Sequence, residues 1–153
     1  MNTRELHTII ESIADHLQVV APKKDLRLLT ALASRYFSHC AIEDLRERSV
    51  DTLCGILFSH WQFICHRRAR EAKIKIFNPT SQQDGWETTH TVIQIVHDDM
   101  PFLVDTTRMA INHHGYEIHF IIHFGGLKIK RDTEHRVTDI LPAHINDQTL
   151  PTH

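Results

Sequence analysis

The chain has 153 residues and a formal net charge of −2, from 17 Lys and Arg against 19 Asp and Glu. This length is sufficient for one domain, or for a helical part joined to a small α+β part, without a stabilising metal or disulfide. The small net charge gives no electrostatic basis for binding nucleic acid or an anionic membrane. No apolar run approaches the ~20 residues that span a bilayer, so we expect no nucleic acid and no membrane as a partner.

The N-terminus and the cysteines indicate the cellular compartment. The first ten residues, MNTRELHTII, contain neither the apolar core nor the small-residue cleavage site of a secretory signal. The three cysteines, Cys40, Cys54 and Cys65, lie in helix-like segments, and nothing in their surroundings marks an activated thiol. Core packing is therefore favoured over catalysis, and an odd number of thiols predicts a reduced, cytoplasmic setting.

The first half of the chain has the apolar periodicity of helices. Apolar residues recur every three to four positions over residues 3–20 and 23–40, and again after Ser49, which suits a helix N-cap. Between the second and third of these segments, residues 43–48 are charged and predict a turn. We therefore expect residues 1–70 to form a helical subdomain.

The periodicity changes after residue 72. Residues 73–77 alternate polar and apolar side chains, which predicts a half-buried strand. Residues 86–97 predict a longer strand with apolar side chains on both faces, as is typical of a strand in the middle of a covered sheet. Residues 118–124 predict a further strand, whose apolar face is formed by Ile118, Phe120, Ile122 and Phe124.

The last part of the chain predicts a hairpin. Residues 127–131 and 137–141 can pair across the intervening polar residues, and Gly125 and Gly126 mark a turn or bulge before them. Residues 142–153 have no period and are interpreted as a polar tail or a truncated connection.

The most informative stretch runs from His97 to Gly115. A strand ends on two acids and turns sharply into a short helix expected over residues 101–114, with Pro101 at its first position. Gly115 suits the left-handed residue just past the helix. A strand, a turn and a capped helix form the first half of a ferredoxin-like β-α-β unit.

The expected fold class is therefore α+β. A helical subdomain is followed, over residues 71–141, by an incomplete ferredoxin-like βαββ unit with an extra preceding strand at residues 73–77. The second helix and the closing strand of a complete unit are missing, so the chain looks like the front of a longer protein.

The acidic turn is the candidate ligand site. Free N–H groups and the positive dipole end of a helix favour a carboxylate at this position. Asp98 and Asp99 either position such a ligand or cap the helix themselves, because both roles use the same N–H groups. The candidate ligand-binding residues are Asp98, Asp99, Pro101, Phe102, Leu103 and Val104.

Catalytic, metal and cofactor sites are not expected in this chain. His119 and His123 would lie roughly 13 Å apart along a strand, too far to share an ion, and no Cys-x-x-Cys or His-Glu-x-x-His motif occurs among the 14 histidines and three cysteines. The five glycines form neither a dinucleotide-binding fingerprint nor a P-loop. The basic residues 66–70 are interpreted as cations at a helix C-terminus, with phosphate contact as the alternative.

Several runs of residues resemble one family, the large bacterial NAD-specific glutamate dehydrogenases, in their N-terminal region. The resemblance covers about residues 35–141 and is most specific in the run Asp98-Asp99-Met100-Pro101-Phe102-Leu103-Val104-Asp105. The other matching runs are 73–79, 85–86, 89–92, 109–112, 118–123 and 128–132, with Tyr36-Phe37, Glu43-Asp44-Leu45 and Trp61 upstream.

The resemblance implies a role without catalysis. The parent enzyme oxidises glutamate to 2-oxoglutarate and ammonium with NAD, and its catalytic domains lie far downstream of this region. The N-terminal region is similar to ACT domains, which bind amino acids at domain interfaces and form oligomers. In this chain Phe102 stands where the usual ACT ligand loop has a glycine, so its side chain could fill the pocket.

Two functions are therefore expected. The first is a regulatory or assembly segment of such an enzyme, with an amino-acid effector, and with self-association or the remainder of the parent as its protein partner. The alternative is a free-standing ACT-like module for amino-acid sensing or oligomerisation. The apolar face formed around Phe120 and Ile122 is the expected surface for self-association.

Overall fold

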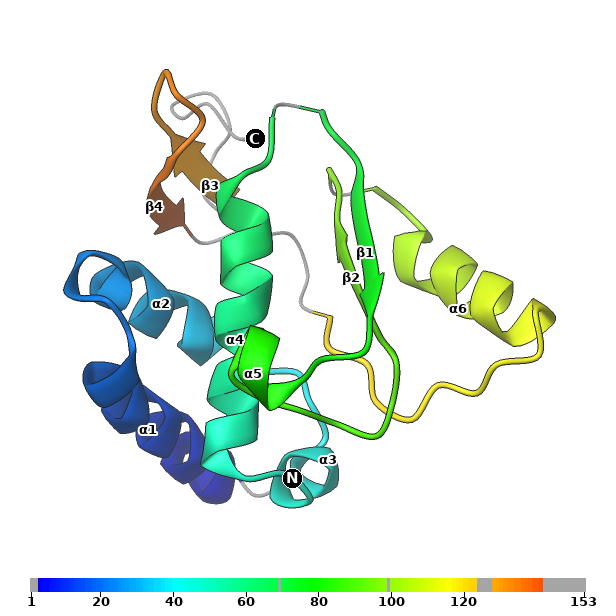
Figure 1. The fold of residues 1–153 in the computed structure, drawn as a ribbon, viewed down its shortest axis with the longest axis horizontal. Helices are drawn as coiled ribbons and strands as arrows, with labels where there is room; N and C mark the ends of the chain where they lie inside the picture. The colour runs from blue at the N-terminus through cyan, green and yellow to red at the C-terminus, as the bar shows by residue number, and fades with distance from the viewer. Residues whose placement is uncertain (1–2, 69, 99, 124–127, 142–153) are drawn as a thin grey trace.

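The fold is α+β in the computed structural model, which describes residues 3–68, 70–98, 100–123 and 128–141 (Figure 1). The helices are α1 (Thr3–Val20), α2 (Lys23–Tyr36), α3 (Ile42–Arg46), α4 (Val50–Cys65), α5 (Ser81–Asp84) and α6 (Leu103–His113). The strands are β1 (Lys73–Phe77), β2 (Val92–Val96), β3 (Lys128–Arg131) and β4 (Val137–Leu141).

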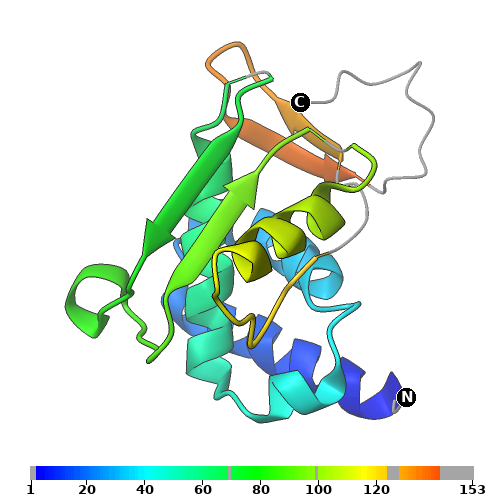
Figure 2. The ribbon, with the colours of Figure 1, turned by 90° about the vertical axis from the view of Figure 1, so that its right-hand side faces the viewer.

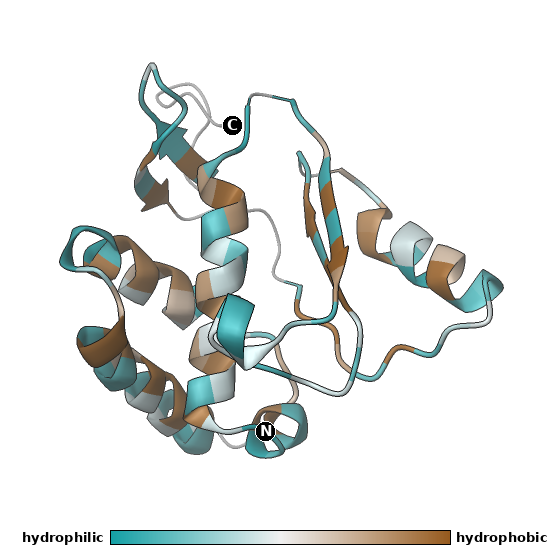
Figure 3. Cartoon of the chain, in the orientation of Figure 1, coloured by the Kyte–Doolittle hydropathy of each residue, from teal (hydrophilic) through white to brown (hydrophobic). Residues whose placement is uncertain are grey.

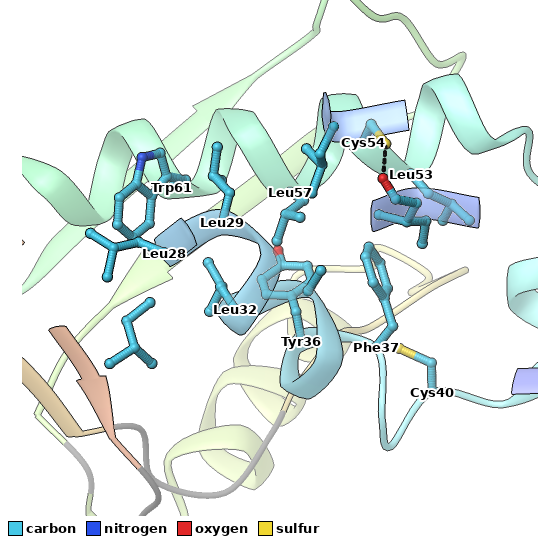
Figure 4. Packing of buried hydrophobic residues seen from close by; sticks show 14 of the residues in the cluster. Leu28, Leu29, Leu32, Tyr36, Phe37, Cys40, Leu53, Cys54, Leu57 and Trp61 are labelled. Atoms are coloured by element: carbon cyan, nitrogen blue, oxygen red, sulfur yellow. Dashed lines mark hydrogen bonds between the residues drawn. The ribbon is translucent and has the colours of Figure 1, made fainter. Parts of the chain in front are cut away.

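Helix α4 lies in the centre, with α1 and α2 on one side and the β1–β2 pair on the other (Figure 1). Apolar side chains from α1, α2 and α4 interdigitate in the core shown in Figure 4, as the predicted helical periodicity requires. The largest side chains buried there to at least 98% are Ile13, Leu17, Leu29, Leu32, Phe37, Leu45, Leu53 and Leu57.

The helix predictions are confirmed for α1 and for the start of α4, where the Ser49 hydroxyl accepts a hydrogen bond of 3.2 Å from the Thr52 N–H. Helix α2 ends at Tyr36, before the expected residue 40. The turn predicted at residues 43–48 is wrong, because the helix α3 forms there. Burial of Ile42 and Leu45 on one side of α3 stabilises a helical turn over an open one.

Strands β1 and β2 pair antiparallel, with Ile74 opposite Ile95 and Ile76 opposite Ile93. The strand predicted at residues 73–77 is confirmed. The strand predicted at 86–97 is shorter, Val92–Val96, and its place in the middle of a sheet is wrong over the described residues, where it pairs with β1 alone. Its apolar character on both faces instead reflects two helices, since α4 and α6 lie on opposite sides of the pair (Figure 1).

Three contacts hold the pair on α4. The Gln94 amide donates to Ser59 Oγ at 3.1 Å, and Lys73 Nζ donates to the Phe63 carbonyl at 3.0 Å. In the connection from β1 to β2, the side chain of Trp86 lies against Gly55 of α4, and Trp86 is 5% exposed. A Cβ at Gly55 would be 2.5 Å from Cβ and Cγ of Trp86, so the close approach of indole and helix requires a glycine.

The strand predicted at residues 118–124 is wrong over the described residues 118–123, which form no strand. Phe120 and Ile122 pack against the helical core, and the Arg48 guanidinium lies 4.0 Å from the centre of the Phe120 ring. These side chains are partly buried against a cluster that comes mainly from helices, and no strand pairing closes the β-α-β unit over residues 118–123. The expected self-association face around Phe120 is therefore partly covered within the chain.

The predicted hairpin is confirmed by the antiparallel pairing of β3 and β4, with an irregularity between Lys130 and Arg131. Ile140 of β4 is 8% exposed and joins the helical core, so the core extends across the expected boundary at residue 70. That boundary itself stays a prediction. Phe124, the turn at Gly125 and Gly126, Leu127 and the tail at 142–153 lie outside the described residues.

A polar link crosses the apolar core between α2 and α4. The Tyr36 hydroxyl and His60 Nδ1 are 2.7 Å apart, and the other ring nitrogen of His60 is buried. Burial lowers the pKa of His60 to about 4, because the charged imidazolium is desolvated. The imidazole is therefore neutral at neutral pH.

The Gly55–Trp86 contact predicts that Gly55→Ala destabilises the fold, whereas helix propensity alone predicts that it stabilises the fold. Gly55→Ala should lower the free energy of unfolding by about 1–3 kcal/mol, because the added methyl overpacks the indole. A Gly-to-Ala change inside a helix otherwise stabilises by up to about 1 kcal/mol. Chemical denaturation of the wild-type chain and of the variant measures this change in the free energy of unfolding.

The matched control is the same change in a Trp86→Gly background, because glycine removes the Cβ of Trp86 as well as the indole. There the methyl no longer meets these atoms, so G55A should stabilise relative to W86G alone. Equal effects of G55A in both backgrounds would contradict the close contact.

Candidate functional site

The candidate ligand turn joins β2 to α6, but its geometry differs from the prediction. Helix α6 begins at Leu103, and Pro101 lies in the preceding turn rather than at the first helical position. Phe102 is the N-cap residue in the left-handed region, with φ 65°, and its carbonyl accepts the first helical hydrogen bond from Thr106 N–H at 2.8 Å. A non-glycine residue in this conformation costs on the order of 1 kcal/mol.

Asp98 binds an arginine and does not cap α6. Its Oδ1 lies 2.5 Å from Nη2 of Arg67, whose side chain is 4% exposed while that of Asp98 is 50% exposed. The hydrogen bond from Arg67 lowers the pKa of the Asp98 carboxyl below its usual value. The capping role considered for Asp98 is therefore wrong, and Asp99 lies outside the described residues.

The N-terminus of α6 has no side-chain cap among the residues that the structure describes. No side chain of the N-cap residue caps the helix, and the N–H groups of Leu103, Val104 and Asp105 precede the first intrahelical bond. The Phe102 side chain is 75% exposed, so it does not fill the space in front of these groups. The structure thus gathers Pro101, Phe102, Leu103 and Val104 at one helix end, with Asp98 turned toward Arg67.

The C-terminus of α6 confirms the role predicted for Gly115. Gly115 has φ 84°, and its N–H donates to the Asn112 carbonyl at 3.0 Å. The next residue, Tyr116, donates its N–H to the Ile111 carbonyl at 3.2 Å. This pair of bonds is a Schellman motif, which requires a left-handed residue that glycine adopts without strain.

Cations do meet the C-terminus of α4, but they come from distant strands. Lys73 Nζ donates to the Phe63 carbonyl, and Arg131 Nη2 donates to the Ile64 carbonyl at 2.8 Å. Arg67, one of the basic residues 66–70, binds Asp98 and the Glu71 carbonyl instead. The role predicted for residues 66–70 is therefore wrong for Arg67, and the cations at this helix end are Lys73 and Arg131, which no local pattern marked.

The cysteines and histidines show no reactive cluster among the residues described. Cys40 and Cys54 are buried and Cys65 is half-buried, and burial raises the pKa of each thiol to about 11. His90 and His119 stack with ring centres 4.4 Å apart. Within the described ranges no three His, Cys, Asp or Glu side chains are placed to hold a metal ion.

A cavity lies at the other end of α6 from the ligand turn. It has a volume of about 260 Å³ and is lined by Asp44, Arg108, Asn112, Glu117 and residues 118–121. None of the six candidate ligand residues lines it. No local sequence pattern marks this cavity, because its walls come from α3, α6 and an irregular segment.

These observations define the class of fold, an α+β segment in which a turn joins the antiparallel β1–β2 pair to the helix α6. The family model described as "Glutamate dehydrogenase, ACT1 domain" matches residues 32–152. The chain therefore belongs to the glutamate dehydrogenase ACT1 domain family.

Two relatives extend this assignment. The chain is 34% identical over 139 residues to the NAD-specific glutamate dehydrogenase of Halomonas elongata, covering 91% of this chain and 9% of that protein. It is 31% identical over 136 residues to the NAD-specific glutamate dehydrogenase of Pseudomonas aeruginosa, covering 89% and 8%. The chain thus spans less than a tenth of the length of these relatives. No solved structure matches.

The resemblance to NAD-specific glutamate dehydrogenases expected from the sequence is therefore confirmed. Across the residues that the structure describes, no helix has the length and apolar character needed to cross a membrane.

The ion pair at the turn predicts a measurable contribution to stability. Asp98→Asn leaves the buried Arg67 without its carboxylate and should lower the free energy of unfolding by about 1–2 kcal/mol. The difference from wild type should shrink in acid, because the stabilisation is lost as the pH falls through the lowered pKa of Asp98. Urea denaturation at pH 7 and at a series of lower pH values down to about pH 2 measures both effects.

The control is Asp139→Asn, which removes a carboxylate from an exposed pair with Arg27 at 3.4 Å. Exposed pairs contribute little, so this variant should lose less than about 0.5 kcal/mol. Equal losses for D98N and D139N would contradict a special role of Arg67.

Proposed function

We propose that this chain is a non-catalytic regulatory or assembly segment of an NAD-dependent glutamate dehydrogenase. The observation that supports this most is its similarity to NAD-specific glutamate dehydrogenases of which it spans less than a tenth. The parent reaction, oxidation of glutamate to 2-oxoglutarate and ammonium, would use NAD bound elsewhere in the enzyme. We propose a cytoplasmic setting for it.

The finer fold assignment belongs to the same proposal. Strand β2, the helix α6 and the segment 118–123 follow the order of a ferredoxin-like, ACT-like unit, preceded by β1 as an extra strand. In this proposal the unit is incomplete, and its missing elements come from outside these residues.

A specific observation favours regulation by an amino acid. The free N–H groups at the start of α6 suit a carboxylate, and the exposed Phe102 side chain leaves them accessible. Asp98 retains a half-exposed carboxylate nearby, which would attract the ammonium group of the same ligand. An amino acid held by residues 101–104 is thus the proposed effector. A free-standing sensing or oligomerisation module is the alternative.

Enzyme assays test the non-catalytic role. The 153-residue chain, mixed with glutamate and NAD, should form no NADH above background by absorbance at 340 nm. The polypeptide encoded by the complete reading frame should form NADH under the same conditions. NADH formation by the short chain, or none by the long polypeptide, would contradict the proposal.

Thermal denaturation separates regulation from assembly. An amino acid at a millimolar concentration about tenfold above its Kd should raise the Tm of the chain by a few °C. The matched control is the α-amide of the same amino acid, which lacks the carboxylate and should give no shift. No shift with any of the twenty amino acids, together with a stable dimer by light scattering, would favour assembly alone.

A further inference from the structure

Another cavity lies on the side of α4 that faces β1. It has a volume of about 350 Å³, and its walls come from α4, β1 and the short helix α5. Figure 2 shows α5 at the end of β1, where the chain turns back toward β2. None of the candidate ligand residues that the structure describes lines this cavity, so it is separate from the amino-acid site proposed above.

The floor of the cavity is one face of α4 and its C-cap. Phe58, Gln62 and His66 recur every four residues, and Ser59 and Phe63 lie beside them. The two phenylalanines are half-buried and Gln62 is exposed. The floor therefore offers apolar ring surface next to uncharged groups that form hydrogen bonds.

One wall of the cavity carries two lysines. Lys73 and Lys75 are two residues apart on β1, so both lie on the side of the strand that faces α4. Figure 3 shows the alternation of hydrophilic and hydrophobic residues along this strand. The Nζ atoms of Lys73 and Lys75 each lie 4.3 Å from a ring centre, that of Phe63 and that of Phe77 respectively. Aromatic faces attract ammonium groups but do not neutralise them.

The positive charge of this wall is not neutralised within the described part of the chain. Neither Lys73 nor Lys75 forms an ion pair with a carboxylate there. The carboxylate among the described lining residues is that of Asp84, whose Oδ2 accepts a hydrogen bond of 2.9 Å from the Thr80 N–H. Two lysines and one aspartate leave a net positive charge, with His66 counted as neutral. Such a charge beside apolar rings favours an anion.

The C-terminus of α4 alone would repel an anion, because its carbonyl groups carry the negative end of the helix dipole. Lys73 removes this obstacle. Its Nζ donates to the Phe63 carbonyl at 3.0 Å and to the His66 carbonyl at 3.5 Å. Lys73 therefore holds β1 on α4, whereas the exposed Lys75 keeps its N–H groups for a ligand.

The size and the lining of the cavity select the class of ligand. Ligand cavities of about 300–1,000 Å³ combine apolar and aromatic walls with a few polar groups, and this one lies at the lower end of that range. One aromatic ring with one acidic group suits this volume. A free amino acid suits it less well, because its ammonium group would meet two lysines.

We propose that the cavity between α4, β1 and α5 binds a small aromatic acid, a ring that carries a carboxylate or a phosphate but no ammonium group. Lys75 pairs with the acidic group, and Lys73 adds a second positive charge. Phe58 and Phe63 contact the ring, and the amide of Gln62 donates a hydrogen bond to the acidic group.

Amide chemical-shift titration of the isotope-labelled 153-residue chain tests the proposal. The probes are phenyl phosphate and 3-phenylpropionate, which carry the two kinds of acidic group on the same ring. Binding of either acid should shift the amides of residues 58–66 and 73–77. Inorganic phosphate lacks the ring, phenol lacks the charge and phenylalanine adds an ammonium group, so each should bind at least about tenfold more weakly than the acids.

Two variants with matched controls assign the effect to this cavity. Lys75→Gln should weaken binding of both acids by about tenfold, because a charged hydrogen bond is lost. Gln62→Trp should abolish binding by filling the cavity without changing a charge. Lys130→Gln on β3 and Gln18→Trp on α1 change exposed residues that do not line the cavity, so they should leave the Kd unchanged. Unchanged shifts of the core amides show that each variant is folded.

Several outcomes would overturn the proposal. One is the absence of shifts at residues 58–66 and 73–77 with both acids at millimolar concentration. Shifts confined to residues 103–106 would place the anion at the start of α6 instead. Equal weakening by K75Q and K130Q would show a general charge effect, and phenylalanine binding as tightly as 3-phenylpropionate would assign the cavity to amino acids. None of these outcomes bears on the dehydrogenase assignment, which the NADH assays test separately.

Discussion

The contact of Trp86 with Gly55 fixes where the sheet lies, and the rest of the structure follows from it. One side of α4 carries Leu53 and Leu57 into the helical core, and the other side meets the indole. A helix with two apolar sides has to be buried on both. Because β1 and β2 are held on α4, their isoleucines face away from it.

The sequence predicted the elements whose signal is local. Helical periodicity identified α1 and α4, Ser49 marked a helix start, and Gly115 marked a helix end, because each of these effects acts within one or two turns. The β3–β4 hairpin was predicted for the same reason. The strand prediction for residues 118–123 was wrong. Their side chains alternate as in a strand, but Phe120 and Ile122 pack against a mainly helical core formed by residues far away in the sequence.

In the candidate site, too, the features set by local sequence were predicted and those set by distant residues were not. The helix terminus at Leu103 was predicted to within two residues of its position, but the left-handed Phe102 was not, because no local pattern favours phenylalanine in that conformation. The partner of Asp98 was also missed. Arg67 lies 31 residues away in sequence, and only the tertiary fold brings the two together. Membership of the glutamate dehydrogenase ACT1 family was accessible from short runs of residues, whereas the exposure of Ile74 and Ile76 on β1 required the structure.

The account depends on α4 and the β1–β2 pair forming one cooperative unit. Native-state hydrogen exchange of the 153-residue chain measures this most directly. The hydrogen-bonded amides of β1 and β2 should exchange with the same opening free energy as those in the middle of α4, while the amides of α6 exchange faster. Strand amides that exchange through a low-energy local opening, while α4 stays protected, would contradict the account.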